Sequence, residues 1–398
     1  MKILVINAGS SSLKYQLFEM SDKSVIAKGI IEKIGGQAEF IFSKKDGEKV
    51  KLSIPAKNHD EAFEVVIKNL TDPQYGFIKS LNEIDAIGHR VVHGGDKFAS
   101  SHLITDEVIK AIEHFSDLAP LHNPPNLKGI QACQKVLPGI PQVAVFDTAF
   151  HQTMPESSYI YAIPYEYYEK YKVRRYGFHG TSHNFVSITA ADFLGKKLED
   201  CNFISCHLGN GASLCAVKNG KSVHTTMGLT PLDGVAMGTR CGSIDPSIIL
   251  YLIEKDHLGT QQLNDILNKK SGMLGVSGVS NDMRDVKAAA AQGNKRAQIA
   301  FDIMVKRVRH YMGAYFIELG RLDAIIFTAG IGENESLFRE KVVEGLEFYN
   351  VVLDKDKNDK TRGTLADLST PESRTKILLV PTNEELMIAL DTEKLAKK

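Results

Sequence analysis

Several polar residues follow apolar runs at positions where they could handle an anionic substrate. Arg90 and Arg240 each lie in a short glycine-flanked segment, GHRVVHGG and GTRCGS. An arginine beside glycines in a weakly charged loop can hold an anion through two parallel N–H donors. His179, in GFHGTSH, could donate to a phosphoryl oxygen. Asp147 and Glu384 follow predicted strands, where carboxylates suit Mg²⁺ held through water. These residue types indicate chemistry on a phosphorylated substrate.

Two of these assignments have competing interpretations. His179 and His183 have the i, i+4 spacing of a helical metal-binding pair. We favour the phosphoryl-donor role for His179, because Gly180 interrupts the expected helix and no third ligand is obvious. For the carboxylates Asp147 and Glu384, helix capping is the alternative to metal binding, especially for Glu384, which lies at a predicted helix start.

Two glycine-rich turns, far apart in the chain, share one plan. Residues 4–17 predict a buried strand, a Ser-rich turn and a second strand that carries Lys14. Residues 202–217 repeat this plan, and the turn at Gly209 aligns with the turn at Gly9. Backbone N–H groups, hydroxyls and a nearby ammonium group favour phosphate oxygens. The repeat predicts a duplicated architecture with a ligand between the halves.

A third turn of this kind follows an apolar strand near the C-terminal end of the chain. It is Gly330–Asn334, and glycine-rich turns at strand ends can direct backbone donors at a nucleotide. The sequence contains no GxxxxGK[ST] motif and no protein-kinase signature, which excludes those two nucleotide-binding classes.

The elements that must position these residues alternate between strands and helices in both halves. Strands are predicted at 85–92, 143–146, 324–327 and 377–380, and helices at 59–70 and 296–320. Asp46-Gly47 predicts a hairpin between 40–42 and 50–52. Residues 121–125 are expected to form an irregular loop, because Pro124 and Pro125 exclude regular pairing. The alternation indicates an α/β fold with mixed sheets.

The bulk composition is that of a soluble globular protein of 398 residues, a length that favours two domains. Lys plus Arg equals Asp plus Glu, 48 each, so the charge balance does not indicate nucleic acid or membrane binding. Five cysteines without a CxxC pair argue against a disulfide framework and a zinc ribbon. With no apolar targeting segment, we expect a cytoplasmic protein. The expected domains are 1–150 with 385–398, and 151–384.

Several longer segments, spread from the first strand to Leu386, are specific enough to compare with a known family. They are VINAGSSSLKYQLF, GHRVVHGG, LHNPP, FDTAFH, RRYGFHGTSH, HLGNGAS, GTRCGSIDP, TAGIGEN and TNEEL. On these segments the chain resembles the acetokinase family, within the sugar kinase, Hsp70 and actin superfamily. The resemblance covers essentially the whole chain, with no departure at a functional position.

This resemblance implies an activity and an architecture. The activity is reversible transfer of the γ-phosphoryl group of ATP to acetate, giving acetyl phosphate and ADP by direct in-line transfer. It depends on Mg²⁺, which Mn²⁺ could replace. The architecture is two duplicated actin/Hsp70-like (ribonuclease H-like) α/β domains with mixed sheets and a nucleotide cleft between them, in a homodimer.

The resemblance also implies a role for each matching residue. The catalytic group would comprise Arg90, His122, Asp147, His179 and Arg240. Mg²⁺ would be bound by Asn7 and Glu384. The acyl substrate would contact Arg90 and a pocket of Val92, Leu121, Phe178 and Pro231. ATP would contact Ser10, Ser12 and Lys14, then His207, Leu208, Gly209, Asn210 and Gly211, then Asp282, Met283 and Arg284, and finally Gly330, Ile331, Gly332, Glu333 and Asn334.

Two alternatives and one refinement follow. A propionate kinase would carry nearly the same motifs, since one methylene changes substrate binding by only ~1–3 kcal/mol. A nucleotide-gated binding protein of the same superfamily would lack the paired arginines Arg90 and Arg240. Acetate is already ionised at neutral pH, because free carboxyl groups titrate near ~4. We therefore expect Asp147 to orient a cation or Mg²⁺ and not to abstract a proton.

Overall fold

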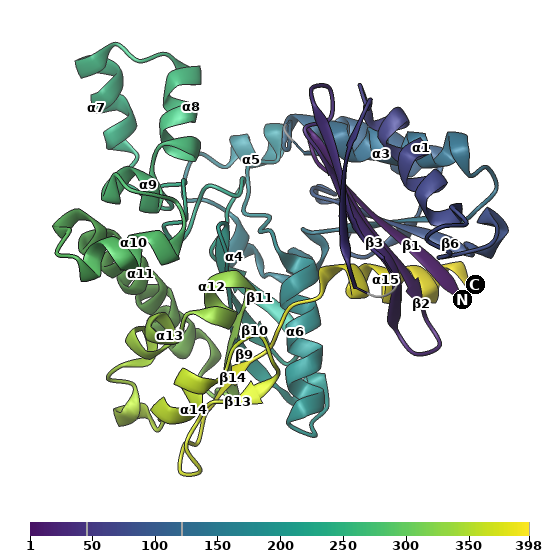
Figure 1. Ribbon diagram of the computed structural model, residues 1–398. Coiled ribbons are helices and arrows are strands. Elements are labelled where there is room, and N and C mark those ends of the chain that lie inside the picture. The colour runs from purple at the N-terminus through teal and green to yellow at the C-terminus, as the bar shows by residue number, and fades with distance from the viewer. Residues whose placement is uncertain (45–46, 121, 398) are drawn as a thin grey trace. The chain divides into compact units, whose positions relative to one another are not determined.

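A computed structural model describes residues 1–44, 47–120 and 122–397 (Figure 1). The chain divides into two compact units, Met1–Gln152 with Asn383–Lys398 (unit 1) and Thr153–Thr382 (unit 2). The boundaries expected after residue 150 and before residue 385 differ from these limits by two residues each. This difference moves Asn383 and Glu384 into unit 1. Within the described ranges, no helix is both long and apolar enough to cross a membrane.

Unit 1 is built on a mixed sheet with the strand order β5-β4-β3-β2-β1-β6-β8-β7. Its strands are β1 Lys2–Ala8, β2 Ser12–Glu19, β3 Ser24–Glu32, β4 Ala38–Ser43, β5 Lys49–Ile54, β6 Ala86–Val91, β7 His102–Leu103 and β8 Gln142–Phe146. Strands β1 to β5 pair antiparallel, whereas β1, β6 and β8 pair parallel. The carboxyl ends of the three parallel strands therefore lie at one edge of the sheet.

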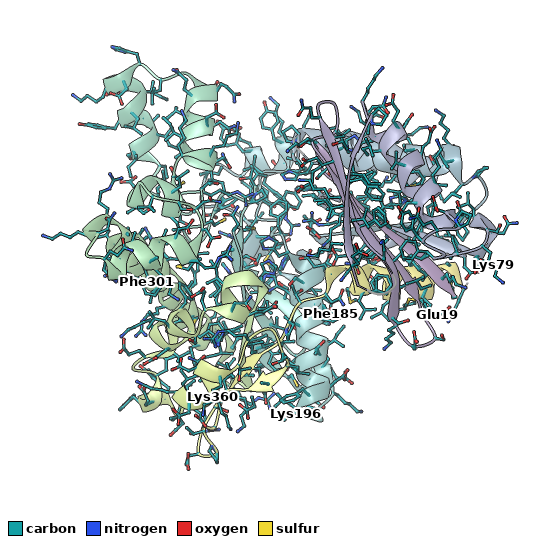
Figure 2. The ribbon with its side chains drawn as sticks, viewed as in Figure 1. Glu19, Lys79, Phe185, Lys196, Phe301 and Lys360 are labelled. Carbon is teal, nitrogen blue, oxygen red and sulfur yellow. The ribbon has the colours of Figure 1, made fainter. Side chains whose placement is uncertain are left out.

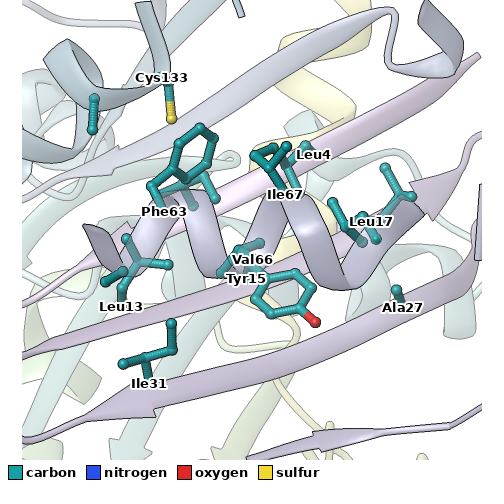
Figure 3. Packing of buried hydrophobic residues seen from close by; sticks show 14 of the residues in the cluster. Leu4, Leu13, Tyr15, Leu17, Ala27, Ile31, Phe63, Val66, Ile67 and Cys133 are labelled. Atoms are coloured by element: carbon teal, nitrogen blue, oxygen red, sulfur yellow. The ribbon is translucent and has the colours of Figure 1, made fainter. Parts of the chain in front are cut away.

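Helices cover both faces of the central strand β1, whose side chains point alternately to one face and the other. The helices are α1 His59–Thr71, α2 Asp106–His114, α3 Asn123–Val136 and α15 Glu384–Ala396. Figure 3 shows Phe63 and Val66 of α1 in one hydrophobic cluster with Leu4 and Leu13 of the sheet. The opposite face of β1 packs against α15, drawn in yellow in Figure 1, through Ile388. Unit 1 is therefore completed by a helix from the C-terminal end of the chain, after unit 2 in sequence.

Unit 2 repeats the plan, in the order β11-β10-β9-β12-β14-β13. Its strands are β9 Asn202–Leu208, β10 Ala212–Lys218, β11 Lys221–Thr225, β12 Ala324–Thr328, β13 Ala366–Asp367 and β14 Lys376–Leu379. Strands β11-β10-β9-β12-β14 correspond in order and direction to β3-β2-β1-β6-β8. The expected α/β class with two mixed sheets of duplicated topology is confirmed.

The helices of unit 2 vary widely in length. They are α4 Glu156–Tyr159, α5 Glu166–Tyr171, α6 Gly180–Phe193, α7 Ser247–Asp256, α8 Thr260–Lys269, α9 Gly272–Ser277, α10 Met283–Ala291, α11 Lys295–Leu319, α12 Ala329–Asn334, α13 Ser336–Val343 and α14 Lys355–Lys360. Helix α11 packs on β10 and β9, and α6 packs on β9 and β12. Charged side chains such as Lys196 and Lys360 are exposed at the outside of this unit (Figure 2).

Most of the predicted elements are confirmed, and three local predictions are wrong. The expected loop at 121–125 is wrong, because α3 begins at Asn123 and holds Pro124 and Pro125 in its first turn. Proline is tolerated there since the first N–H groups of a helix lack intrahelical acceptors. Gly180 does not interrupt α6 but begins it. The turn at Gly330–Asn334 is a short helix, α12. Leu121 lies outside the described residues.

Candidate functional site

A buried ion pair joins the ends of two parallel strands in unit 1. Arg90 lies near the end of β6, and Asp147 directly follows the neighbouring strand β8. The Nε and Nη2 atoms of Arg90 both donate to Oδ2 of Asp147, at 3.1 and 2.5 Å. The Asp147 side chain is 1% exposed, and a carboxylate so buried requires a cationic partner. Asp147 therefore fixes the direction of the Arg90 guanidinium.

Two glutamates at the start of α15 add negative charge to this group. Burial raises the pKa of Glu384 to about 7; the carboxylates of Asp147 and Glu385 add to the rise, whereas Arg90 and Lys14 oppose it. Burial disfavours the charge of Arg90, but Asp147 and Glu384 outweigh it and raise the pKa of Arg90. The helix cap predicted as an alternative role for Glu384 is supplied by Asn383, whose side chain accepts from Leu386 N at 3.0 Å. Capping therefore does not account for Glu384.

The first hairpin brings a lysine to the same glutamates. Asn7 of β1 and Lys14 of β2 are paired in register, and Lys14 Nζ forms an ion pair with Glu385. The turn between these strands is closed by the Gly9 N–H, which donates to the Ser12 carbonyl oxygen at 2.8 Å. Ser10 is exposed at the tip of this turn. The Asn7 amide, Lys14 and Glu384 thus all belong to unit 1.

Two buried asparagines that sequence reasoning missed hold the strand ends together. Asn126 Nδ2 donates to the Ala8 carbonyl oxygen at 2.7 Å, and its Oδ1 accepts from Val92 N at 3.0 Å. Asn123 makes a matching pair of hydrogen bonds to the backbone N–H and carbonyl oxygen of His93. Both asparagines lie in the first turns of α3, where the segment NPPN places two amides one turn apart. That spacing is the sequence pattern from which a shared role of the two amides could have been predicted.

Val92 and His122, two further predicted residues, are fixed by backbone hydrogen bonds in unit 1. Val92 is 3% exposed and is held by Asn126. His122 precedes α3, and its backbone N–H donates to the Ala119 carbonyl oxygen at 3.0 Å. The predicted acyl-pocket residues Phe178 and Pro231 lie in unit 2, where Phe178 is buried.

Three histidines and two serines form a polar cluster at the second hairpin, in unit 2. His179 precedes α6 with a left-handed backbone (φ 57°), and its Nδ1 lies 2.9 Å from Ser213 Oγ of β10. The ring of His179 stacks on that of His207 of β9, with centroids 4.1 Å apart. His207 Nδ1 lies 2.8 Å from Ser182 Oγ. His183, from α6, completes the cluster.

Arg240 lies beside the same hairpin, near His179. Its Nη1 donates to the Pro231 carbonyl oxygen at 3.2 Å, and burial lowers its pKa. A Cβ placed on Gly211 would lie 3.5 Å from Arg240 Nη1 and 3.6 Å from His179 Nε2. The predicted donors Arg240 and His179 therefore flank one point above Gly211, as two groups that hold one anion must.

A cavity of about 380 Å³ lies beside this point and collects residues from three predicted segments. It is lined by Gly209, Asn210, Asn281, Asp282, Met283, Arg284, Gly330, Ile331, Asn334 and Glu335. Sequence reasoning missed Asn281 and Glu335. Asn281 Nδ2 donates to Asn210 Oδ1 at 3.0 Å, and Glu335 forms an ion pair with Lys287. The Asn281–Asn210 hydrogen bond and the Glu335–Lys287 ion pair join residues that are distant in sequence, so only the fold reveals them.

Two residues that are predicted to contact the nucleotide, Asp282 and Glu333, make hydrogen bonds that stabilise the local structure. Hydrogen bonds from Arg284 lower the pKa of Asp282 to about 2, and the Asp282 side chain caps α10. Glu333 Oε1 accepts from Ala329 N at 2.9 Å and from Thr382 N at 3.1 Å. The Glu333 carboxylate therefore fastens the turn after β12, and it does not line the cavity.

The predicted site residues fall into two groups, one in each unit. Unit 1 holds Asn7, Ser10, Ser12, Lys14, Arg90, Val92, His122, Asp147 and Glu384. Unit 2 holds Phe178, His179, Pro231, Arg240 and the segments of the cavity and second hairpin, among them His207, Leu208, Gly211, Gly332 and Glu333. In unit 1 the site residues form ion pairs, Arg90 with Asp147 and Lys14 with Glu385. In unit 2 the second hairpin joins imidazoles and hydroxyls, and charged residues, among them Arg240 and the Asp282–Arg284 ion pair, lie in other segments of the group.

Comparison with known proteins gives one consistent result. The sequence profile of the acetokinase family matches residues 2–390. An acetate kinase of Caldanaerobacter subterraneus subsp. tengcongensis is 58% identical over 100% of this chain and 99% of its own length. The acetate kinase of Halothermothrix orenii is 56% identical, with full coverage of both chains.

Solved structures agree with these relatives. The crystal structure of Porphyromonas gingivalis acetate kinase superposes with a TM-score of 0.96 at 48% identity, covering 99% of both chains. A propionate kinase from Francisella tularensis superposes with a TM-score of 0.92 at 42% identity, again over 99% of both chains.

Proposed function

Because the chain belongs to the acetokinase family, we propose that it transfers the γ-phosphoryl group of ATP reversibly to acetate, giving acetyl phosphate and ADP. The observation that carries the proposal is the cavity in unit 2, where three segments with the family's nucleotide-binding motifs converge. Full-length identity to acetate kinases supports acetate as the acceptor. The propionate kinase is less similar, at 42% identity, so acetate is the preferred substrate in this proposal.

The arrangement of charges suits transfer between two anions. Acetate is ionised at neutral pH, so it needs no base, but its carboxylate repels the γ-phosphate. In the proposal, Arg90 binds the acetate carboxylate while Asp147 holds the guanidinium in place. Arg240 and His179 donate to the phosphoryl oxygens, whose charge develops as the bond breaks. The transfer is direct and in line, and no phosphorylated protein side chain is needed.

The residues of unit 1 fit a Mg²⁺ ion. Mg²⁺ prefers oxygen ligands and is held by one or two carboxylates with phosphates and water, not by a closed protein cage. Glu384 offers a carboxylate and Asn7 an amide oxygen, and no group of three or more His, Cys, Asp or Glu side chains able to hold a metal occurs among the described residues. When bound, Mg²⁺ would neutralise phosphate charge. We propose Asn7 and Glu384 as its protein ligands.

Two finer proposals concern the protein's assembly and location. The family resemblance supports a homodimer. All five cysteines are free thiols, which supports a reducing, cytoplasmic environment.

The test is a coupled assay of ADP formation from ATP and Mg²⁺ with acetate, propionate or butyrate. We expect the fastest turnover with acetate, slower turnover with propionate and little with butyrate, and loss of activity when Mg²⁺ is chelated. Equal turnover of acetate and butyrate would contradict the substrate assignment. ADP release that does not depend on any carboxylic acid would favour a nucleotide-gated binding protein instead.

A further inference from the structure

A buried histidine that has no assigned role lies behind His179. His183 is 0% exposed, and both of its ring nitrogens lie next to serine hydroxyls. Its Nδ1 is 2.8 Å from Ser205 Oγ, and its Nε2 is 2.9 Å from Ser213 Oγ. Ser213 Oγ is also 2.9 Å from Nδ1 of His179. The four groups form one chain, from Ser205 through His183 and Ser213 to His179.

The residues of this hydrogen-bonded row come from strands and a helix of the unit 2 fold. Ser205 and Ser213 belong to the antiparallel strands β9 and β10, His183 lies in α6, and His179 precedes that helix. Both serines are 0% exposed. Because an unpaired buried polar group costs free energy, the hydrogen bonds between these serine hydroxyls and imidazole nitrogens should be maintained in the folded protein.

Proton counting links the tautomers of the two histidines. A hydroxyl carries one proton, and a neutral imidazole has one donor and one acceptor nitrogen. If Ser213 donates to Nδ1 of His179, it must accept from Nε2 of His183, and His183 Nδ1 must then accept from Ser205. His179 then carries its own proton on Nε2. If every bond points the other way, His179 carries its proton on Nδ1.

The position of Arg240 selects between the states of His179. Arg240 Nη1 and His179 Nε2 lie within 3.6 Å of the same point above Gly211. Arg240 already places a positive charge beside this point, so His179 can complete an anion site there as a neutral donor. To donate to an anion at this point, neutral His179 needs its proton on Nε2.

We propose that Ser213, backed by His183, is a positioning residue that holds neutral His179 with its proton on Nε2. The inference rests on the proposed phosphoryl transfer, in which that N–H donates to the phosphoryl group. The ring plane is held separately, because His179 stacks on His207, and His207 is hydrogen-bonded through Ser182 to Thr382. Ser213 therefore controls which nitrogen carries the proton, and the stack controls where the ring lies.

The test joins a spectroscopic measurement to kinetics. In ¹⁵N-histidine-labelled protein without substrates, the ring-nitrogen shifts of His179, assigned with His179→Gln, should show a protonated Nε2. In Ser213→Ala this preference should weaken, and kcat should fall roughly 10- to 100-fold, less than the loss of a whole transition-state donor. The KM for acetate should change by less than about twofold, since a tautomer preference does not alter acetate binding.

Matched variants separate positioning from a loss of packing. Ser187→Ala removes another buried hydroxyl of α6, one that donates only to the His183 carbonyl oxygen, and should leave kcat within about twofold. Ser205→Ala should cause a smaller fall than Ser213→Ala, because it acts through His183. Ser213→Cys replaces the hydroxyl by a slightly larger thiol that hydrogen-bonds only weakly, and it covers the case in which Ser213→Ala does not fold.

The outcomes are decisive in both directions. The inference is overturned if His179 carries its proton on Nδ1 in the unmodified protein, or if Ser213→Ala and Ser213→Cys keep the wild-type kcat. An equal fall in kcat for Ser187→Ala and Ser213→Ala would also overturn it, since packing alone would explain both. If the unmodified protein shows no acetate-dependent ADP formation, the proposed function fails, while the ring-nitrogen shifts still report the tautomer.

Discussion

The hairpin β1–β2 of unit 1 and the hairpin β9–β10 of unit 2 occupy the same place in two sheets of the same strand order, yet they carry different chemistry. Asn7 is paired with Lys14 across the first hairpin, and His207 is paired with Ser213 across the second. Lys14 reaches a carboxylate, Glu385, whereas Ser213 joins two imidazoles. The same backbone positions thus carry an ion pair in one unit and hydroxyl–imidazole hydrogen bonds in the other.

In our proposal, this difference divides one reaction between the two units. Charges suit the acetate carboxylate and Mg²⁺, which are compact ions. A cavity lined by glycines and polar side chains suits a nucleotide, which offers many oxygens and a flat base. In our proposal, unit 1 therefore manages the charge of the acceptor and the metal, and unit 2 binds the nucleotide and adds Arg240 at the transferring phosphoryl group. The predictions that follow test this division, beginning with the largest effect.

The largest effect is expected from Asp147→Asn in unit 1. Asparagine keeps the shape but removes the charge that orients Arg90. Because the loss of one preorganised electrostatic contact lowers kcat by about 100- to 1,000-fold, activity should fall by about 100-fold or more. A pH–rate profile with saturating substrates should show the loss at every pH, because ionised acetate gives a base nothing to abstract. Recovery towards wild-type rates at high pH would restore a general-base role for Asp147.

The matched control for this prediction lies in unit 2. Asp323 is also buried, and its carboxylate accepts from Asn202 N at 2.8 Å and pairs with Lys196. Asp323 directly precedes β12 and lies far from the turn of the second hairpin. Asp323→Asn should therefore lower the free energy of unfolding with little change in kcat. Equal loss of activity in both variants would attribute the Asp147 effect to stability.

The next effect separates the two arginines. Arg240→Ala should lower kcat by about 100- to 1,000-fold with little change in the KM for acetate, because its bonds strengthen only as charge develops. Arg90→Ala should raise the KM for acetate as well, as expected of a group that binds the ground-state carboxylate. Steady-state kinetics with Arg321→Ala as an exposed control would decide it. If Arg240→Ala changed only the KM for acetate and left kcat unchanged, the proposed division of roles between the two units would be contradicted.

The sequence predicted where the candidate site residues lie in the fold better than it predicted the contacts that hold them there. Arg90 lies near the end of a strand and Asp147 directly follows one, whereas His179 and Arg240 lie in glycine-containing segments, so these positions could be inferred from local pattern. The role of Asn126 could not, because its partners, Ala8 and Val92, are 118 and 34 residues away. The chain through Ser213 likewise depends on two strands and a helix meeting. The loop predicted at Pro124 was wrong because proline is compatible with a first helical turn.

A smaller effect concerns stability in acid, and here the two units should behave alike. Burial lowers the pKa of His89 in unit 1 and of His224 in unit 2 to about 4. Both are neutral when folded, whereas the unfolded chain takes up a proton below about pH 6.5. Stability that is full above that pH is therefore lost as the pH falls towards 4, by about 2 kcal/mol per histidine at pH 5.

The check is urea unfolding at pH 7 and pH 5. His89→Gln and His224→Gln should each reduce the difference in unfolding free energy between the two pH values. His257→Asn, at an exposed position after α7, should leave the difference unchanged. If neither buried histidine alters it, other groups govern the loss in acid.

The smallest effect compares the two turns directly, through Gly9→Ala and Gly211→Ala. At Gly9 a Cβ would lie 2.7 Å from Ser12 Oγ, the end of a small side chain that can rotate away. At Gly211 it would make ordinary contacts of 3.5–3.6 Å with Arg240 Nη1 and His179. The second Cβ therefore fits the folded chain but fills the point where, in our proposal, the phosphoryl group lies. We expect kcat to fall about tenfold in Gly211→Ala and less than about threefold in Gly9→Ala, with both unfolding free energies close to wild type. If Gly9→Ala proved the more damaging variant at unchanged stability, the phosphoryl group would belong to the first turn, and the division between the units would be reversed.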